Sequence, residues 1–291
     1  METNLVLPRL LVTIRKLWKT RRLDFLFTVS GFIIVTVVTL MAVAAPLIAP
    51  YDPIKSAGKP RLSPSLRYPM GTDGLGRDVF SRIVYGSRTV MTVVLLSTLI
   101  SMGIGTSAGL ISGYLGGLID RALSLVMDSI YSFPGLILAI AVAAILGPGV
   151  FNTVVSISIV YIPTYFRMIR GQTLSVKNQL YVEAAEALGA SKLTILRRYV
   201  LPNVITVLPV VFSMNVADAV LTEAGLSFLG LGVPSPTPDW GFDLKNGQRY
   251  LLAGYWWMSI FPGIMIVILA LGFSLLGEGL NELLNPERRY R

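Results

Sequence analysis

Long, nearly charge-free apolar blocks dominate this sequence and limit what it can fold into. A helix that crosses a bilayer needs about 20 apolar residues, whereas a buried helix of a soluble protein seldom needs more than about 14. Only 14% of the 291 residues are charged, while a soluble domain carries about 25%. The sequence therefore predicts an all-α polytopic membrane protein with six transmembrane helices, at residues 25–48, 89–115, 122–146, 150–168, 203–225 and 258–280.

Two further features indicate how these spans pack. Gly147-Pro148-Gly149 separates the third span from the fourth and predicts a tight hairpin between them. The second span contains small residues, which let neighbouring helices approach closely. They are Gly103, Gly105, Ser107, Gly109 and Gly113.

Lysine and arginine are distributed unevenly between the connecting segments. The N-terminal arm and residues 167–202 carry six each and the tail carries three, whereas 147–149 and 231–257 together carry only two. Because cytoplasmic loops of membrane proteins are enriched in these residues, both termini are predicted to be cytoplasmic. The segment 50–88 opposes this pattern, since it is predicted to lie outside and yet carries seven basic residues. The other segments decide the orientation.

The predicted organisation follows from the spans and their orientation. It comprises a cytoplasmic N-terminal arm (1–24), a first transmembrane helix (25–49), an extracytoplasmic loop (50–88), a five-helix core (89–282) that contains a cytoplasmic loop at 169–202, and a cytoplasmic tail (283–291). The protein is thus expected in the cell membrane as a multi-pass protein, with the lipid bilayer as its solvent.

The composition excludes several chemistries. The chain contains neither cysteine nor histidine, which excludes disulfides and removes the commonest general base and metal ligand. The net charge of +9 is explained by the basic cytoplasmic loops of a membrane protein, so no nucleic-acid partner is predicted. Because no Gly-x-Ser-x-Gly nucleophile elbow is present either, an enzyme is the least favoured interpretation.

The cytoplasmic loop predicts two short amphipathic helices joined by a sharp turn. The first, 179–188, has an apolar face formed by Tyr181, Val182, Ala185 and Leu188. Gly189 lies where a left-handed helix cap is wanted, and Ser191 is placed to begin the next helix. The second helix, 192–200, is expected to bury Leu193, Leu196 and Val200, and Pro202 is expected to begin the fifth span.

Two interpretations of this helix pair compete. The pair could rest on the lipid surface, or it could dock into another protein. Ala184, Ala185 and Ala187 favour docking, because small side chains allow close approach to a partner, whereas a helix that rests on lipid prefers Trp, Phe or Leu.

The same loop resembles the EAA loop of ABC importer permeases, whose pattern is Glu-Ala-Ala, three residues, Gly and a distal Leu-Pro. The matching residues are Glu183, Ala184, Ala185, Gly189, Leu201 and Pro202. Further stretches resemble the second permease subunit of dipeptide/oligopeptide importers, at Leu47–Pro53, Met70–Asp78, Ser81–Arg88 and Glu223–Gly232. The resemblance implies the type I (MetI-like) permease bundle.

The resemblance also implies a function. It implies a channel-forming permease subunit that imports di/oligopeptides by alternating access, with the six matching loop residues as its ATPase-coupling residues. The implied partners are a second homologous permease, two cytoplasmic ABC ATPase subunits and an extracytoplasmic solute-binding protein. The tail departs from this branch at Phe273, Glu278 and 285–288. Because relatives also carry oligosaccharides or metal ions, these substrates remain alternatives.

The chain has no nucleotide-binding loop of its own. No Gly-x-x-x-x-Gly-Lys-Ser/Thr occurs, so ATP and Mg are expected on the partner ATPases and no cofactor is expected in this chain. A secondary transporter driven by an ion gradient is the alternative of a different class, because ionisable residues within spans are functional suspects. A non-transporting scaffold would give no reason for a docking loop. The expected translocation-path or gate residues are Asp128, Asn215, Asp218 and Glu223.

Overall fold

The computed structural model describes residues 6–284, with side chains over 25–282, and this part of the chain is helical without a strand. Residues 1–5 of the predicted arm and 285–291 of the predicted tail lie outside the described residues. The helices are α1 (Val6–Val43), α2 (Ala45–Ile48), α3 (Val79–Leu115), α4 (Gly117–Tyr131), α5 (Gly135–Leu146), α6 (Val150–Lys177), α7 (Leu180–Ala187), α8 (Lys192–Ile195), α9 (Leu201–Val204), α10 (Leu208–Leu229), α11 (Trp240–Leu251) and α12 (Trp257–Leu284).

Within the described part of the chain, four helices are long and apolar enough to cross a membrane: Phe25–Val43 within α1, α3, the run Lys192–Leu229, and Trp257–Glu282 within α12. The pair α4–α5 adds a fifth if it counts as one span. The predicted fourth span lies in α6, which does not qualify, because Arg167, Asn152 and several Ser and Thr residues lower its hydropathy. α6 packs along α3 and therefore belongs to the bundle. The number of six spans stays a prediction.

The predicted third span is not one straight helix. The chain bends by 90° between α4 and α5, at Ser132–Pro134. Pro134 immediately precedes α5, and proline cannot donate the backbone hydrogen bond that would continue α4. The apolar block therefore forms two short helices. The predicted hairpin after α5 is present, with positive φ at Gly147 and Gly149.

Two helical boundaries also differ from the prediction. The second span begins at Val79 rather than near residue 89, because Asp78 caps the helix by accepting a hydrogen bond from the Ser81 N–H at 2.7 Å. The loop predicted at 231–257 contains α11, whose N-cap Asp239 accepts from the Phe242 N–H at 2.9 Å. Both segments were predicted as loops because they contain charged residues, which are rare in membrane spans.

The second short cytoplasmic helix and the fifth span are one continuous helix, Lys192–Leu229. Pro202 was predicted to begin the fifth span, but it lies within this continuous helix. A π-helical turn, Leu196–Val200, ends two residues before Pro202. In this turn the Leu201 N–H donates a hydrogen bond to the Leu196 carbonyl. In a regular α-helix the proline ring would clash with the carbonyl four residues earlier, and the wider turn accommodates it.

Small residues bring α3 and α6 into close contact. A Cβ added at Gly105 or Gly109 would lie 2.6 Å from a backbone oxygen of α6, so only glycine permits this spacing. The Ser101 hydroxyl donates across the contact to the Ser158 carbonyl at 2.9 Å. In lipid, where apolar surface alone drives little association, such close packing holds helices together. Gly103 has nothing within 4 Å and is not part of this contact.

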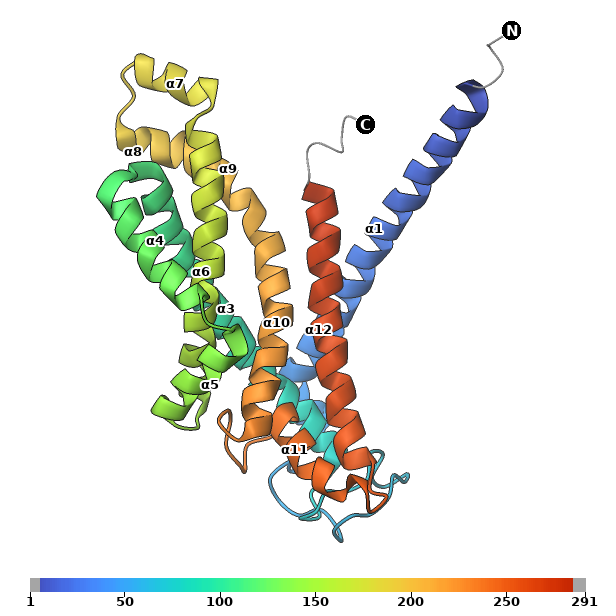
Figure 1. The fold of residues 1–291 in the computed structure, drawn as a ribbon. Coiled ribbons are helices and arrows are strands. Elements are labelled where there is room, and N and C mark those ends of the chain that lie inside the picture. Colours follow the sequence, from blue (N-terminus) through green and yellow to red (C-terminus); the bar gives the residue numbers. More distant parts are fainter. Residues whose placement is uncertain (1–5, 285–291) are drawn as a thin grey trace.

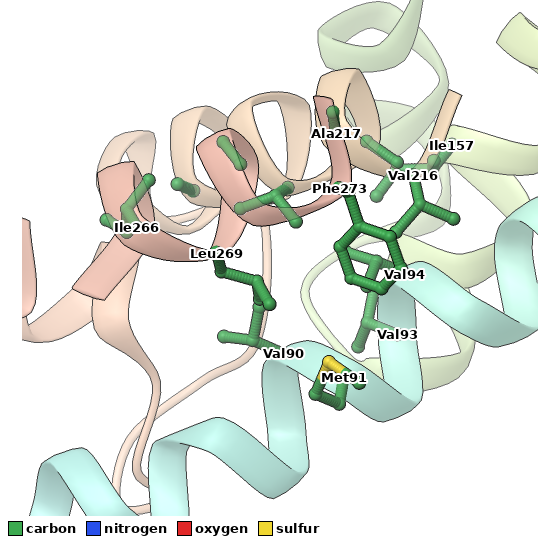
Figure 2. Close-up of a cluster of buried hydrophobic side chains, with 14 of the residues drawn as sticks. Val90, Met91, Val93, Val94, Ile157, Val216, Ala217, Ile266, Leu269 and Phe273 are labelled. Atoms are coloured by element: carbon green, nitrogen blue, oxygen red, sulfur yellow. The ribbon is translucent and has the colours of Figure 1, made fainter. Parts of the chain in front are cut away.

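The main core lies where α3, α6, α10 and α12 meet (Figure 2). Val90, Val93 and Val94 of α3 are fully buried and face Val216 of α10 and Leu269 of α12. β-Branched side chains lose little freedom here, because each has one preferred rotamer in a helix. The core therefore fixes α10 relative to α3 and α12.

The bundle has two distinct ends. The short helices α7 and α8 lie at the same end as the start of α1 and the end of α12 (Figure 1). The loop 50–78 and α11 lie at the opposite end, called here the loop end. The start of α1 and the end of α12 thus lie at the same end as the 169–202 loop, and the side of the membrane that this end faces stays a prediction.

Candidate functional site

The pair α7–α8 is built around a left-handed turn, as predicted. Gly189 has a φ of +83°. Its N–H bonds the Glu186 carbonyl at 2.9 Å, and the Ala190 N–H bonds the Ala185 carbonyl at 3.0 Å. These two bonds satisfy carbonyls that the end of α7 would otherwise leave open. Ser191 then caps α8, since its hydroxyl accepts from the Thr194 N–H at 3.3 Å.

A small apolar cluster fixes the pair to the bundle. Val182 of α7 and Ile195 of α8 are buried against Ile169 of α6 and Tyr114 of α3. The Tyr114 hydroxyl donates to the Lys192 carbonyl at 2.9 Å, and the Lys177 ammonium donates to the Tyr114 carbonyl at 2.8 Å. The turn is therefore attached to the ends of two long helices.

The opposite face of the pair is exposed and apolar. Leu180 of α7 is 81% exposed, Leu188, its C-cap, is 89% exposed, and Leu193 of α8 is 55% exposed. Leu193 was expected to be buried, and this prediction is wrong. Tyr181 and Leu188, predicted to share one apolar face with Val182 and Ala185, are exposed, whereas Val182 and Ala185 are buried. Because α7 has only two turns, only Val182 and Ala185, which lie one turn apart on the same face, are buried against the bundle.

The six loop residues of the sequence pattern fall into three settings. Glu183 and Ala184 are exposed on α7, while Ala185 is buried beneath them. Gly189 forms the turn. Leu201 is half-buried and Pro202 exposed, both within the continuous helix that leads into α10. The structure therefore places the first four residues of the pattern in α7 and its turn, whereas Leu201 and Pro202 lie in the helix that continues into the span.

Asp128 pairs with α6. Its carboxylate lies 2.6 Å from Arg167, whose guanidinium stacks over the Tyr131 ring at 3.9 Å from the centroid. Both partners of the ion pair are about half exposed, so it contributes little stability by itself.

Asp218 is the exposed carboxylate of α10. The buried Tyr161 hydroxyl of α6 donates to it at 2.7 Å and lies 3.0 Å from the Thr222 hydroxyl. Among residues 25–282, no lysine or arginine pairs with Asp218. A carboxylate at the depth of a span faces protein or water rather than lipid. Asn215, one turn earlier, is buried.

Glu223 is fully buried in α10, six residues before its end. It accepts a hydrogen bond from the Ser227 hydroxyl at 2.9 Å and faces Asp239, the buried N-cap of α11. Burial raises the pKa of the Asp239 carboxyl. The four predicted path residues therefore do not form one cluster, because Asp128, Asp218 and Glu223 have different partners.

Sequence reasoning missed a buried ion pair at the loop end. Arg82 of α3 is 1% exposed and lies 2.6 Å from Asp243 of α11. Its guanidinium also donates to the Pro53 carbonyl at 2.9 Å, which ties the 50–78 loop to the bundle. Asp239 was detectable as an N-cap before an amphipathic stretch, whereas the partner of Arg82 was not. Within the described chain, no three acidic side chains are grouped to hold a metal ion.

Comparisons with known proteins agree with this arrangement. The family described as "Binding-protein-dependent transport system inner membrane component" matches residues 105–290. The glutathione transport system permease protein GsiD of Pectobacterium atrosepticum is 38% identical over 94% of this chain and 91% of its own length. The probable D,D-dipeptide transport system permease protein DdpC of Escherichia coli is 40% identical over 89% of this chain and 87% of its own length.

A solved structure supports the fold. A chain of the MetNI methionine ABC transporter, in an inward-facing conformation, superposes with a TM-score of 0.56 over 70% of this chain and 96% of its own, at 20% identity. The predicted all-helical, MetI-like permease bundle is thereby confirmed. The family match covers well over half of the chain, and the relatives align along nearly all of it. The chain belongs to the family of inner-membrane permease components of binding-protein-dependent transport systems.

Proposed function

We propose that this permease imports short peptides, driven by ATP that separate subunits hydrolyse. The curated relatives carry names that refer to glutathione and to a D,D-dipeptide, and both are short peptides. Their identity of 38–40% over most of the chain favours peptides over oligosaccharides or metal ions.

The observation that carries the ATP-driven mechanism is the exposed apolar face of α7–α8. Leu180, Leu188 and Leu193 present exposed apolar surface, and the small Ala184 and the acidic Glu183 are exposed on the same helix pair. Apolar side chains at the centre of a surface, with a polar rim, are typical of a protein interface. We assign this face to a cytoplasmic ATPase subunit, which supplies the nucleotide and Mg that this chain has no loop to bind.

The remaining partners follow from the same assignment. Two ATPase subunits, a second homologous permease and an extracytoplasmic solute-binding protein complete the proposed importer. Both termini then lie in the cytoplasm with α7–α8, and the loop end faces the binding protein. The positive-inside pattern of the sequence supports this orientation.

Alternating access is the proposed mechanism. ATPase movement acts on α7–α8 and passes through the helix Lys192–Leu229 to α10. Asp128, Asn215, Asp218 and Glu223 are proposed path or gate residues, of which Asp218 is exposed and pairs with no lysine or arginine among residues 25–282. Docking and the bundle conformation are linked, and such linkage is typically worth about 1–3 kcal/mol.

Reconstituted uptake tests the proposal. The permease pair, its ATPases and its binding protein are placed in liposomes, and ATP-dependent uptake of a labelled dipeptide is compared with that of a disaccharide and of Ni²⁺. Dipeptide uptake alone is expected. Uptake of the disaccharide or the metal without the dipeptide would show that the substrate assignment is wrong.

A charge reversal tests the docking face. Glu183→Arg is expected to abolish ATP-dependent uptake, while Asn178→Arg, the same positive charge on an exposed residue just before α7, leaves it intact. A helix pair that rests on anionic lipid would instead tolerate or favour arginine. Wild-type uptake and ATPase co-purification by Glu183→Arg would contradict docking through this face.

A further inference from the structure

A cavity of about 260 Å³ lies at the loop end, enclosed by the 50–78 loop, the start of α3, α11 and the start of α12. It is separate from the proposed path, because none of Asp128, Asn215, Asp218 and Glu223 lines it. Three arginines and two aspartates line it: Arg77, Arg82, Arg249, Asp73 and Asp243. The wall therefore carries a net charge of +1.

The two aspartates already hold donors from the protein. Asp73 Oδ1 accepts the N–H groups of Leu75 at 2.8 Å and of Arg77 at 2.9 Å, and its Oδ2 accepts Arg77 Nε at 2.6 Å. Both oxygens of Asp243 accept from the Arg82 guanidinium. Neither carboxylate is therefore free to attract a cation into the cavity.

The uncommitted polar side chains of the wall can all donate, although the Asn246 amide and the Tyr250 hydroxyl can also accept. Arg77 is only 5% exposed, and Nε is the one guanidinium nitrogen that makes a hydrogen bond within the described chain. Its two terminal nitrogens remain for a ligand. Arg249 forms no ion pair among residues 25–282, and no hydrogen bond there engages the Asn246 amide or the Tyr250 hydroxyl. A buried guanidinium with open donors favours an anion beside it.

The shape of these donors selects the kind of anion. A guanidinium fork matches a carboxylate with two parallel hydrogen bonds, whereas a lysine would act as a point charge. The volume lies below the usual 300–1,000 Å³ of drug-sized ligand sites, so the ligand is small. We propose that this cavity binds the carboxylate of one small solute, with Arg77 and Arg249 as its charged contacts.

The binding itself does not depend on the proposed transport function. Only its location on the extracytoplasmic side rests on the orientation given above. The test therefore uses the purified full-length chain in detergent without ATPases, so that a failure of coupling or of the substrate assignment leaves it unaffected.

The test compares N-acetylglycine with N-acetylglycinamide, which replaces the carboxylate by a neutral amide. Calorimetric titration is expected to show saturable binding of the acid at least tenfold tighter than that of the amide. Arg77→Lys keeps the charge and the ion pair with Asp73 but loses the fork. Arg249→Gln removes an exposed charge. Each is expected to weaken binding of the acid at least tenfold.

Lys59→Gln is the matched control, because it removes a positive charge from an exposed residue of the same loop that does not line the cavity. It is expected to bind like the wild type. Equal binding of acid and amide, no saturable binding of the acid, or wild-type affinity in both Arg77→Lys and Arg249→Gln would overturn the proposal. Inorganic phosphate that binds tenfold tighter than N-acetylglycine would overturn the assignment to a carboxylate.

Discussion

Substitution of Gly189 tests whether the turn between α7 and α8 sets the docking geometry. Gly189 has a φ of +83°, and a Cβ added there would meet no heavy atom within 4 Å. Any effect of a larger residue is therefore conformational, since no steric contact contributes. The left-handed conformation costs an ordinary L-residue roughly 1–2 kcal/mol, asparagine tolerates it best, and a β-branched residue resists it most.

The expected result is an order of effects. Each 1.4 kcal/mol by which the docking-competent turn is disfavoured lowers the apparent affinity for the ATPases by at most about tenfold. Gly189→Asn is expected to bind almost like the wild type, Gly189→Ala several-fold more weakly, and Gly189→Val the most weakly. None of these variants touches a span, so expression and insertion should be unchanged.

The assay titrates the partner ATPases onto the permease complex in nanodiscs and measures both binding and substrate-stimulated ATP hydrolysis. Gly171→Ala is the matched control, because Gly171 lies within α6 with helical φ and open space around its Cβ. Wild-type affinity of a folded Gly189→Val would refute the reasoning. An equal loss for Asn and Val would show that the left-handed φ is not the cause.

Three further perturbations concern stability, measured by thermal unfolding in detergent. Arg82→Ala is expected to destabilise by about 3–5 kcal/mol, because it leaves Asp243 buried without its partner; a much smaller loss would show that water replaces the guanidinium. Gly109→Ala is expected to destabilise by about 1–3 kcal/mol, since its Cβ would lie 2.6 Å from a backbone oxygen of α6, whereas Gly103→Ala, with open space, should not destabilise. Because burial raises the pKa of Asp239, the folded chain binds a proton that the unfolded chain releases. The resulting stabilisation is complete below about pH 4 and is lost as the pH rises through the folded pKa. Asp239→Asn should flatten this dependence, and an unchanged slope relative to the wild type would contradict the assignment.

The membrane class and most of the bundle were predictable because apolar periodicity over a long block is a local signal. The small residues of the second span also predicted that a neighbouring helix approaches closely at Gly105 and Gly109. The structure shows that this helix is α6. Local chemistry likewise predicted Gly189 and Ser191, because helix caps depend on two or three neighbouring residues.

What the sequence concealed depends on long-range partners. Arg82 was assigned to a loop that ended at residue 88, because a charged residue is not expected inside a span. Its buried partner Asp243 lies 161 residues away and could not be found from the neighbouring sequence. The burial of the apolar face of α7 depends on the bundle in the same way. Leu188 belongs to the apolar pattern but is exposed, because a helix of two turns has room for few contacts with the bundle. The missed cavity is another case, because Arg77, Asn246 and Arg249 meet only when α11 packs on α3.

The continuity of Lys192–Leu229 changes what the docking face can do. A proline-broken connection, as predicted, would let α8 move without moving α10. In the structure one helix joins them, and the path from Lys192 to Asp218 is about 40 Å long at 1.5 Å per residue. Only two irregular turns interrupt its α-helical geometry, the π turn Leu196–Val200 and the 3₁₀ turn Ile205–Val207. Such turns are where long helices bend. Val200 and Val204 are buried in the cluster that anchors the pair, and Val207 and Leu208 pack against it. Both irregular turns are therefore held to the bundle, and a displacement at α8 reaches α10 through one connected helix.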